Sequence, residues 1–209
     1  MKKWVWFILV AILTILTGCV GSGVGSGGAS GLRISGEDVA AVGGFLDLRA
    51  HGGNKYTFSA SGGSFIHQDK DRAVWQAPMS PGNYIIRVES GGKTVTKTVT
   101  VVDAPARITA WSLVNDGIGG KDARITIRNT SARAITAVRI QIAMWNNFGE
   151  RVTYFGEYLF RGEASDTYIA PGAEKTFLWS LYWASGVTNI APWVVEVAFE
   201  DGTAWKLYN

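Results

Sequence analysis

Residues 82–102 read GNYIIRVESGGKTVTKTVTVV and contain two β-type segments separated by a glycine pair. A two-residue loop at Gly91-Gly92 is typical of a tight antiparallel hairpin. The resulting register alternates apolar with charged or hydroxyl side chains, so that one face of the hairpin is apolar. Lys97 is the exception, because it falls on the apolar face opposite Ile86. We expect its aliphatic stem to lie at the sheet margin with the amine in water.

A second hairpin is predicted at the end of the sequence. A two-residue loop there would pair Val197 with Lys206 and mix apolar with charged side chains on one face. A three-residue loop over residues 200–202, with Gly202 in a left-handed conformation, pairs Val197 with Trp205 and leaves Lys206 outside. The pattern therefore favours the three-residue loop.

Working outward from these hairpins, we expect an all-β protein with two tandem antiparallel β-sandwich domains. Residues 32–103 contain short β-type segments separated by glycine pairs, and residues 104–209 contain about seven longer ones and no good helix pattern. Asp103-Ala104-Pro105 reads as the joint between them. In the second domain the segments ending at Trp145 and Trp183 alternate with period two, which predicts half-buried strands.

Composition narrows the function. The chain has 209 residues, of which 47% are apolar, so it is long enough and apolar enough for a real core. A single cysteine excludes a disulfide framework and multi-thiolate metal sites. Neither of the two histidines, His51 and His67, has a second histidine at the spacing of a metal site. We therefore expect no metal site and no resident cofactor. Asp69-Lys70-Asp71 lacks the following glycine of a calcium loop.

The first twenty residues predict the cellular location of the protein. Lys2 and Lys3 precede an apolar stretch over residues 4–16, which is too short for a membrane span and suits a signal peptide. The following Leu16-Thr17-Gly18-Cys19 resembles the lipobox of bacterial lipoproteins. That resemblance implies a signal peptide over residues 1–18 and a covalent diacylglycerol on Cys19.

The residue after the lipobox cysteine is Val20, and this bears on sorting. In the lipoprotein family, Asp at this place is a retention signal in bacteria with two membranes. Its absence implies the outer membrane or cell surface within the bacterial envelope. Residues 19–31 then form the acylated cysteine and a Gly/Ser tether with a reach of about 18 Å.

Net charge gives no support for a nucleic-acid partner. The full chain carries 20 basic and 17 acidic side chains, a formal charge of +3. Removal of the leader with Lys2 and Lys3 leaves 18 against 17, or +1. The expected partners are therefore the membrane, through the lipid, and an envelope protein or glycan, with no nucleic acid.

Two further resemblances concern the domains. Trp75-Gln76-Ala77-Pro78, followed by Gly82-Asn83-Tyr84 and a Thr/Val strand, resembles bacterial immunoglobulin-like modules of the PKD-like kind. This implies a fold and no particular ligand. The Asn146–Glu150 and Ala170-Pro171-Gly172 turns and the terminal hairpin resemble uncharacterised immunoglobulin-like domains of bacterial surface proteins.

No catalytic constellation is found. Glu150, Glu157, Glu163 and Asp166 fall in one aromatic-rich stretch, and a hydrolase using them is the weakest of the hypotheses. Aromatic side chains on the outer face of the second sandwich are the better candidates, because such rings stack on sugars. The predicted ligand-binding residues are Trp145, Tyr182, Arg139 and Gln141. An alternative stays open for Trp145, which the first domain or residues 151–168 would cover.

The sequence thus predicts a non-enzymatic, lipid-anchored envelope protein. Its β-sandwich modules are expected to serve a structural or protein-interaction role. The alternative is a carbohydrate-binding surface lipoprotein that uses exposed aromatic residues of the second domain.

Overall fold

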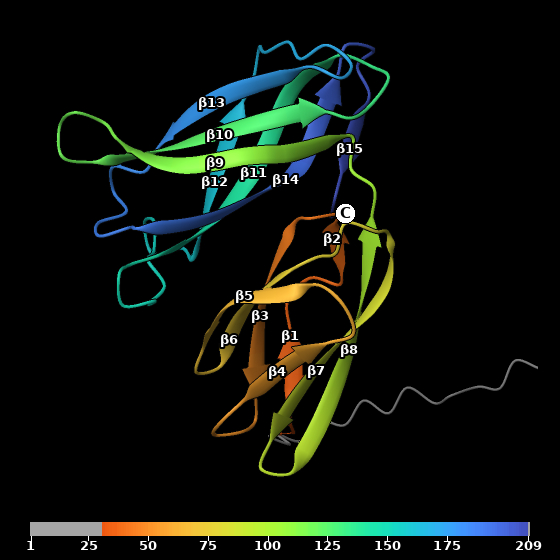
Figure 1. The fold of residues 1–209 in the computed structure, drawn as a ribbon, viewed down its shortest axis with the longest axis vertical. Helices are drawn as coiled ribbons and strands as arrows, with labels where there is room; N and C mark the ends of the chain where they lie inside the picture. Colours follow the sequence, from red (N-terminus) through yellow and green to blue (C-terminus); the bar gives the residue numbers. More distant parts are fainter. Residues whose placement is uncertain (1–30, 209) are drawn as a thin grey trace, which may run out of the picture.

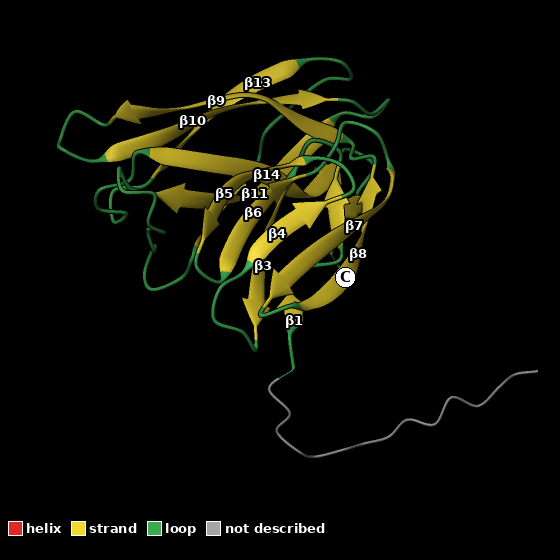
Figure 2. Ribbon diagram, turned by 60° about the horizontal axis from the view of Figure 1, so that its bottom comes forward, coloured by secondary structure: helices red, strands yellow, loops and turns green. Residues whose placement is uncertain are grey.

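The computed structural model describes residues 31–208, which consist of strands and loops arranged as two modules (Figures 1 and 2). Cys19, the leader and most of the Gly/Ser tether lie outside the described residues. Within the described part of the chain, no helix is long and apolar enough to cross a membrane. The all-β, sandwich-type fold predicted from the sequence is confirmed.

The first module is built from two four-stranded sheets, with orders β1-β3-β6-β5 and β2-β8-β7-β4. Its strands are β1 (Arg33–Ser35), β2 (Val39–Ala41), β3 (Phe45–His51), β4 (Thr57–Ala60), β5 (Ser64–Asp69), β6 (Arg72–Gln76), β7 (Gly82–Ser90) and β8 (Lys93–Val102). All pairings are antiparallel except that of β2 with β8. The inward faces bury Trp75 completely, and its indole Nε1 donates to the Gly62 carbonyl at 3.0 Å.

The β7–β8 hairpin has the predicted register. Ser90 pairs with Lys93 and Ile86 pairs with Lys97, so Gly91 and Gly92 alone form the loop. Both glycines have positive φ angles, 56° and 73°, as a tight hairpin turn requires. Lys97 is half-buried, and it lies at an open edge of the sheet as expected, because β2 pairs with β8 only from Thr100 to Val102.

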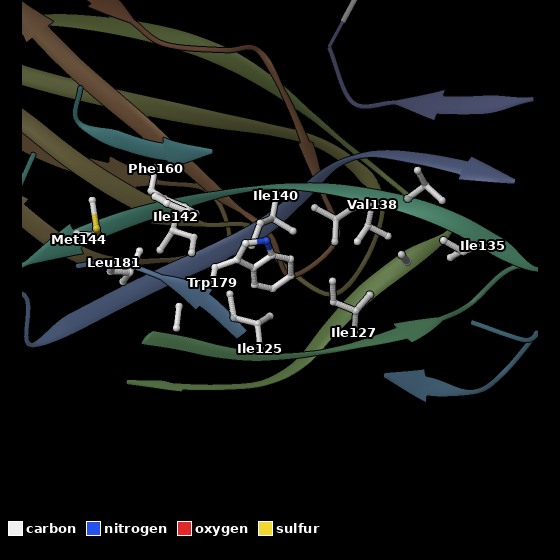
Figure 3. Packing of buried hydrophobic residues seen from close by; sticks show 14 of the residues in the cluster. Ile125, Ile127, Ile135, Val138, Ile140, Ile142, Met144, Phe160, Trp179 and Leu181 are labelled. Carbon is white, nitrogen blue, oxygen red and sulfur yellow. The ribbon is translucent and has the colours of Figure 1, made fainter. Parts of the chain in front are cut away.

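The second module contains a three-stranded sheet, β13-β10-β9, packed on a four-stranded sheet, β12-β11-β14-β15. Its strands are β9 (Ala106–Asn115), β10 (Lys121–Asn129), β11 (Ile135–Trp145), β12 (Leu159–Ala164), β13 (Glu174–Ser180), β14 (Asn189–Phe199) and β15 (Ala204–Lys206). Figure 3 shows Trp179 between the sheets, close to Ile125 and Ile140. β10 and β11 together supply eight of the nineteen buried residues of this core, and the other strands and loops supply the rest.

The terminal hairpin confirms the three-residue loop. Val197 pairs with Trp205, and the Phe199 amide donates to the Thr203 carbonyl at 2.9 Å. Gly202 has a φ of 80°, the left-handed conformation that the prediction requires. The Lys206 ammonium lies 3.3 Å from the Glu196 carboxylate on the outer face.

The two modules share a buried apolar cluster, here called the module junction. It consists of Ala41, Phe45, Val74, Ala143, Trp145, Ala191, Trp193 and Leu207. An ion pair crosses the junction, because the Arg151 guanidinium lies 3.0 Å from Asp47, and both side chains are largely buried. The outer face of the β11–β14 sheet is therefore covered by the first module where it carries Trp145.

The start of the described chain and the second module lie at opposite ends of the first module. Arg33 of β1 pairs with His51, the last residue of β3, whereas Phe45 at the other end of β3 belongs to the module junction. Figure 1 shows the second module above the first, with β1 beginning near the lower end of the first module. Strand β8, with ten residues, spans about 33 Å of this distance.

Candidate functional site

Three loops meet at one end of the second module and carry exposed apolar side chains. They connect β9 to β10 (residues 116–120), β11 to β12 (146–158) and β13 to β14 (181–188), and they lie at the left of the upper module in Figure 1. Their five most exposed large apolar residues are here called the loop-end surface: Ile118, Phe148, Phe155, Tyr182 and Trp183. Apolar residues gathered in this way mark interaction sites.

Two of these loops are built around a single polar side chain that satisfies the backbone. Asp116 Oδ1 accepts hydrogen bonds from the amides of Ile118 and Gly120, at 2.9 and 2.8 Å. Asn146 Oδ1 accepts in the same way from the amides of Phe148 and Glu150, both at 2.9 Å. Each loop thereby holds a large apolar side chain, Ile118 or Phe148, at its exposed tip.

Phe155 is held in a strained conformation with its ring in solvent. It has a φ of 51°, which bulky residues rarely adopt, and its side chain is 74% exposed. Tyr154 and Glu157 close this turn by exchanging backbone hydrogen bonds at 2.9 and 3.0 Å. Strain of this kind, stored at an exposed aromatic residue, is typical of functional sites.

Tyr182 and Trp183 lie in the turn that follows β13. The strand ends at Ser180, and the next amide, that of Leu181, donates to the Lys121 carbonyl at 2.8 Å. The ring centroids of Tyr182 and Trp183 are 5.1 Å apart and perpendicular, and Phe155 lies 5.9 Å from Trp183. Tyr182 is 48% exposed and Trp183 63% exposed, so both rings are accessible.

A cavity of about 470 Å³, here called the loop-end cavity, opens beside these rings. The 116–120 loop and the 182–188 turn form its walls, and Asn147 reaches it from the third loop. Its side-chain polar groups come from Lys121, Asn147, Tyr182, Ser185 and Thr188.

The expectation that Trp145 is exposed is wrong. Trp145 is 4% exposed, because the first module covers the outward face of β11 at this point. Its ring lies 5.0 Å from the His67 ring, and the Arg151 guanidinium lies 5.4 Å from the indole. The alternative of a covered Trp145 is the one that the structure supports, and this ring is not available to stack on a ligand.

Arg139 and Gln141 lie on the same outer face as Trp145 but outside the junction. Both line a shallow hollow of about 410 Å³ on the sheet. Arg139 bridges two strands, with its guanidinium 2.8 Å from Glu163 and 2.6 Å from Glu196. The Glu163 and Glu196 carboxylates raise the pKa of Arg139, and Arg139 in turn holds the pKa of Glu196 below its usual range. Tyr182, at the loop end, does not share this hollow.

The loop-end residues other than Tyr182 were missed by reasoning from strand periodicity. The period-two alternation that ends at Trp183 predicts that the Trp183 ring points into the core. However, β13 ends at Ser180, and the alternation does not continue into the turn that carries Trp183. The signal that would have found the others is an apolar residue beside turn glycines. Ile118 and Phe155 both have this setting, and an apolar side chain in a tight turn has no strand to pack against.

The four acidic residues of the hydrolase hypothesis are spread over the module. Glu150 and Glu157 belong to the loops at the loop end, Glu163 is bound to Arg139 on the sheet, and Asp166 lies in the turn after β12. No group of three or more metal-ligating side chains exists among residues 31–208.

Comparison with known proteins gives a family match to the second module. Residues 123–207 match the model of a family of unknown function (DUF5780). This range runs from β10 to the end of β15 and includes Tyr182 and Trp183. The chain matches no curated protein.

Solved structures show distant likenesses. A hypothetical protein from Peptoclostridium difficile 630 is 15% identical, with a TM-score of 0.40, and the alignment covers 50% of this chain and 87% of that chain. The adhesin InvE of Yersinia pseudotuberculosis is 14% identical, with a TM-score of 0.30, covering 86% and 59%. Domains 5–6 of the S-layer protein SbsC are 12% identical, with a TM-score of 0.29, covering 79% and 96%.

Proposed function

We propose that this is a non-enzymatic, lipid-anchored protein of the bacterial cell envelope, held at the outer membrane or cell surface by Cys19. Its modules serve a structural and interaction role, in which the first module holds the second away from the lipid and the second presents the loop-end surface to a partner. The observation that carries the proposal is the placement of the second module at the end of the first opposite the chain start.

Tether and module together define how far the surface stands from the membrane. The Gly/Ser residues 21–31 reach about 18 Å, and the first module adds about 33 Å along β8. The module junction fixes the second module on the first, since it buries two tryptophans and an ion pair. The loop-end surface is therefore held beyond the lipid headgroups, where it meets a partner in the envelope or outside the cell.

The chemistry of the loop-end surface supports the interaction role. Phe155, Tyr182 and Trp183 expose large aromatic rings, and tryptophan and tyrosine are enriched among the residues that dominate binding energy at interfaces. Phe155 keeps this exposure at the expense of backbone strain. A glycan is the alternative to a protein partner, and the exposed Tyr182 beside Trp183 favours it.

The anchor is tested by labelling with a radioactive or alkyne-bearing fatty acid in a bacterial host. The wild-type chain should incorporate the label and sediment with membranes, whereas Cys19→Ser should lose the label. An unlabelled wild-type chain, or an equally labelled Cys19→Ser variant, would show that Cys19 is not lipidated.

The interaction role is tested with the mature chain from residue 19, carrying Cys19→Ser and a fluorescent label. It should bind isolated cell envelopes saturably, and Trp183→Ala should weaken this binding about tenfold. Tyr168→Ala is the matched control, because Tyr168 is an exposed aromatic residue remote from the three loops. Equal binding by all three chains would contradict a role for the loop-end surface.

A further inference from the structure

The loop-end cavity has a lining that is polar but almost uncharged. Asn147, Tyr182, Ser185 and Thr188 line it and carry an amide and three hydroxyl groups, of which the Thr188 hydroxyl already donates to the Trp145 carbonyl at 3.3 Å. Lys121 is the single cation among the lining residues that the structure describes, and its ammonium already donates to Asn115 Oδ1 at 2.5 Å. The nearby Asp116 uses one carboxylate oxygen to hold the loop amides.

This lining determines the charge of the ligand that the cavity fits. An anionic ligand would find a single ammonium group, that of Lys121, and a cationic ligand would find no carboxylate among the lining residues. A neutral ligand rich in hydroxyl groups matches the four uncharged side chains, because hydroxyls both donate and accept hydrogen bonds. The volume of about 470 Å³ lies in the range of small-molecule sites.

The aromatic rings beside the cavity supply the apolar stacking surface that a sugar-binding site needs in addition to polar groups. Pyranose rings have apolar C–H faces that stack on aromatic rings while their hydroxyls bond to polar groups at the edge. Tyr182 lines the cavity itself, the Trp183 ring centroid lies 5.1 Å from that of Tyr182, and Phe155 extends the aromatic surface with its ring 5.9 Å from Trp183. The rings are mutually tilted by 88° and 43°, which suits a short glycan segment that turns, and not a flat crystalline polysaccharide.

We propose that the loop-end cavity and the adjoining Tyr182 and Trp183 rings bind a neutral hexose-type glycan. This inference rests on the proposed function, because it names the partner of the loop-end surface. One sugar unit occupies the cavity against Asn147, Ser185 and Thr188, and the next unit stacks on the exposed indole of Trp183.

The first test is titration of the mature Cys19→Ser chain with short neutral oligosaccharides of glucose, mannose, galactose and N-acetylglucosamine, followed by tryptophan fluorescence. At least one series should shift the emission saturably, with affinity rising from one to two units. Trp183→Ala and Asn147→Ala should each weaken binding about tenfold, and Tyr168→Ala should leave it unchanged. If no series binds, or if Tyr168→Ala has the same effect, the inference is wrong.

The second test separates failure of this inference from failure of the proposed function. Cell envelopes are treated either with periodate, which cleaves the vicinal diols of sugars, or with a broad protease. Binding of the labelled chain should be lost after periodate and kept after protease. Binding that is lost after protease but kept after periodate would establish a protein partner and overturn the glycan. Envelopes that never bind the chain would overturn both proposals.

Discussion

Arg151 shows how one side chain links the two modules. Its guanidinium bonds to Asp47 of the first module at 3.0 Å and to the Tyr158 carbonyl of its own loop at 2.7 Å. Burial lowers the pKa of Arg151, and the Asp47 carboxylate opposes this lowering. Arg72 bonds to the same carboxylate at 3.3 Å, so two cations share one anion. Loss of Asp47 would leave buried positive charge unpaired, which typically costs about 3–5 kcal/mol.

His67 makes the junction sensitive to acid. Burial, and then the nearby Arg151 cation, lower the pKa of His67 below the ordinary value of 6.5, while Asp69 and Asp47 act in the opposite direction. As the pH falls, the unfolded chain therefore binds a proton at His67 at a higher pH than the folded chain does. By linkage, the free energy of unfolding should fall as the pH drops below about 6.5, and level off once the folded ring is protonated.

This prediction is measured by urea unfolding between pH 7.5 and pH 5, where the carboxylates stay ionised. The loss should be of the order of 1 kcal/mol or less, since the ring retains some contact with solvent. His67→Gln should remove part of the slope. Burial, followed by the nearby Arg33 and Arg49 cations, also lowers the pKa of His51, which lies at the opposite end of β3 and bonds to Ser35 at 2.8 Å. His51→Gln therefore measures the part of the slope that arises outside the junction. Equal slopes in the wild type and His67→Gln would contradict the prediction.

At the scale of elements, the hairpins were predictable because their geometry is local. Strand side chains alternate with a period of two, so a shift by one residue moves every apolar side chain to the wrong face. The loop lengths at Gly91-Gly92 and at 200–202 then follow from the pattern alone. The seven strands of the second module follow in the same way, from alternation interrupted by turn residues.

The terminal hairpin offers a test of backbone conformation alone. Gly202 has a φ of 80°, and a Cβ added there would meet no atom within 4 Å. Gly202→Ala should therefore destabilise the protein by about 1–2 kcal/mol through the left-handed backbone and not through a clash. Gly202→Asn should cost less, because asparagine tolerates this region. Thermal unfolding measures both variants, and identical losses, or none, would contradict a left-handed residue at this position.

At the scale of the whole molecule, the module junction holds the two β-sandwich modules together as one body. Ala191 is fully buried in it, on the outer face of β14, whereas Ala198 on the same strand lies beside a surface hollow. Ala191→Arg should place a cation in the apolar cluster, separate the modules and increase the radius of gyration in small-angle scattering. Unfolding should then split into two transitions.

Ala198→Arg is the matched control for this separation and should leave the scattering curve unchanged. Circular dichroism should show that both variants keep their strand content. A compact Ala191→Arg chain that unfolds in one step would mean that the junction does not hold the modules together.

The sequence by itself determined the all-β class, the hairpin registers and the local character of the turns, because these depend on alternation and on backbone preferences of neighbouring residues. Only the tertiary structure decided which outward-facing side chains meet solvent. Trp145 alternates with inward residues of β11, yet it is covered by a module that begins more than 100 residues earlier, through contacts such as Asp47 with Arg151. Ile118, Phe155 and Trp183, which lie far apart in the sequence, are gathered at one end because β9–β10, β11–β12 and β13–β14 all turn there. Period-two patterning records which face of its own sheet a residue occupies, but not what packs against that face.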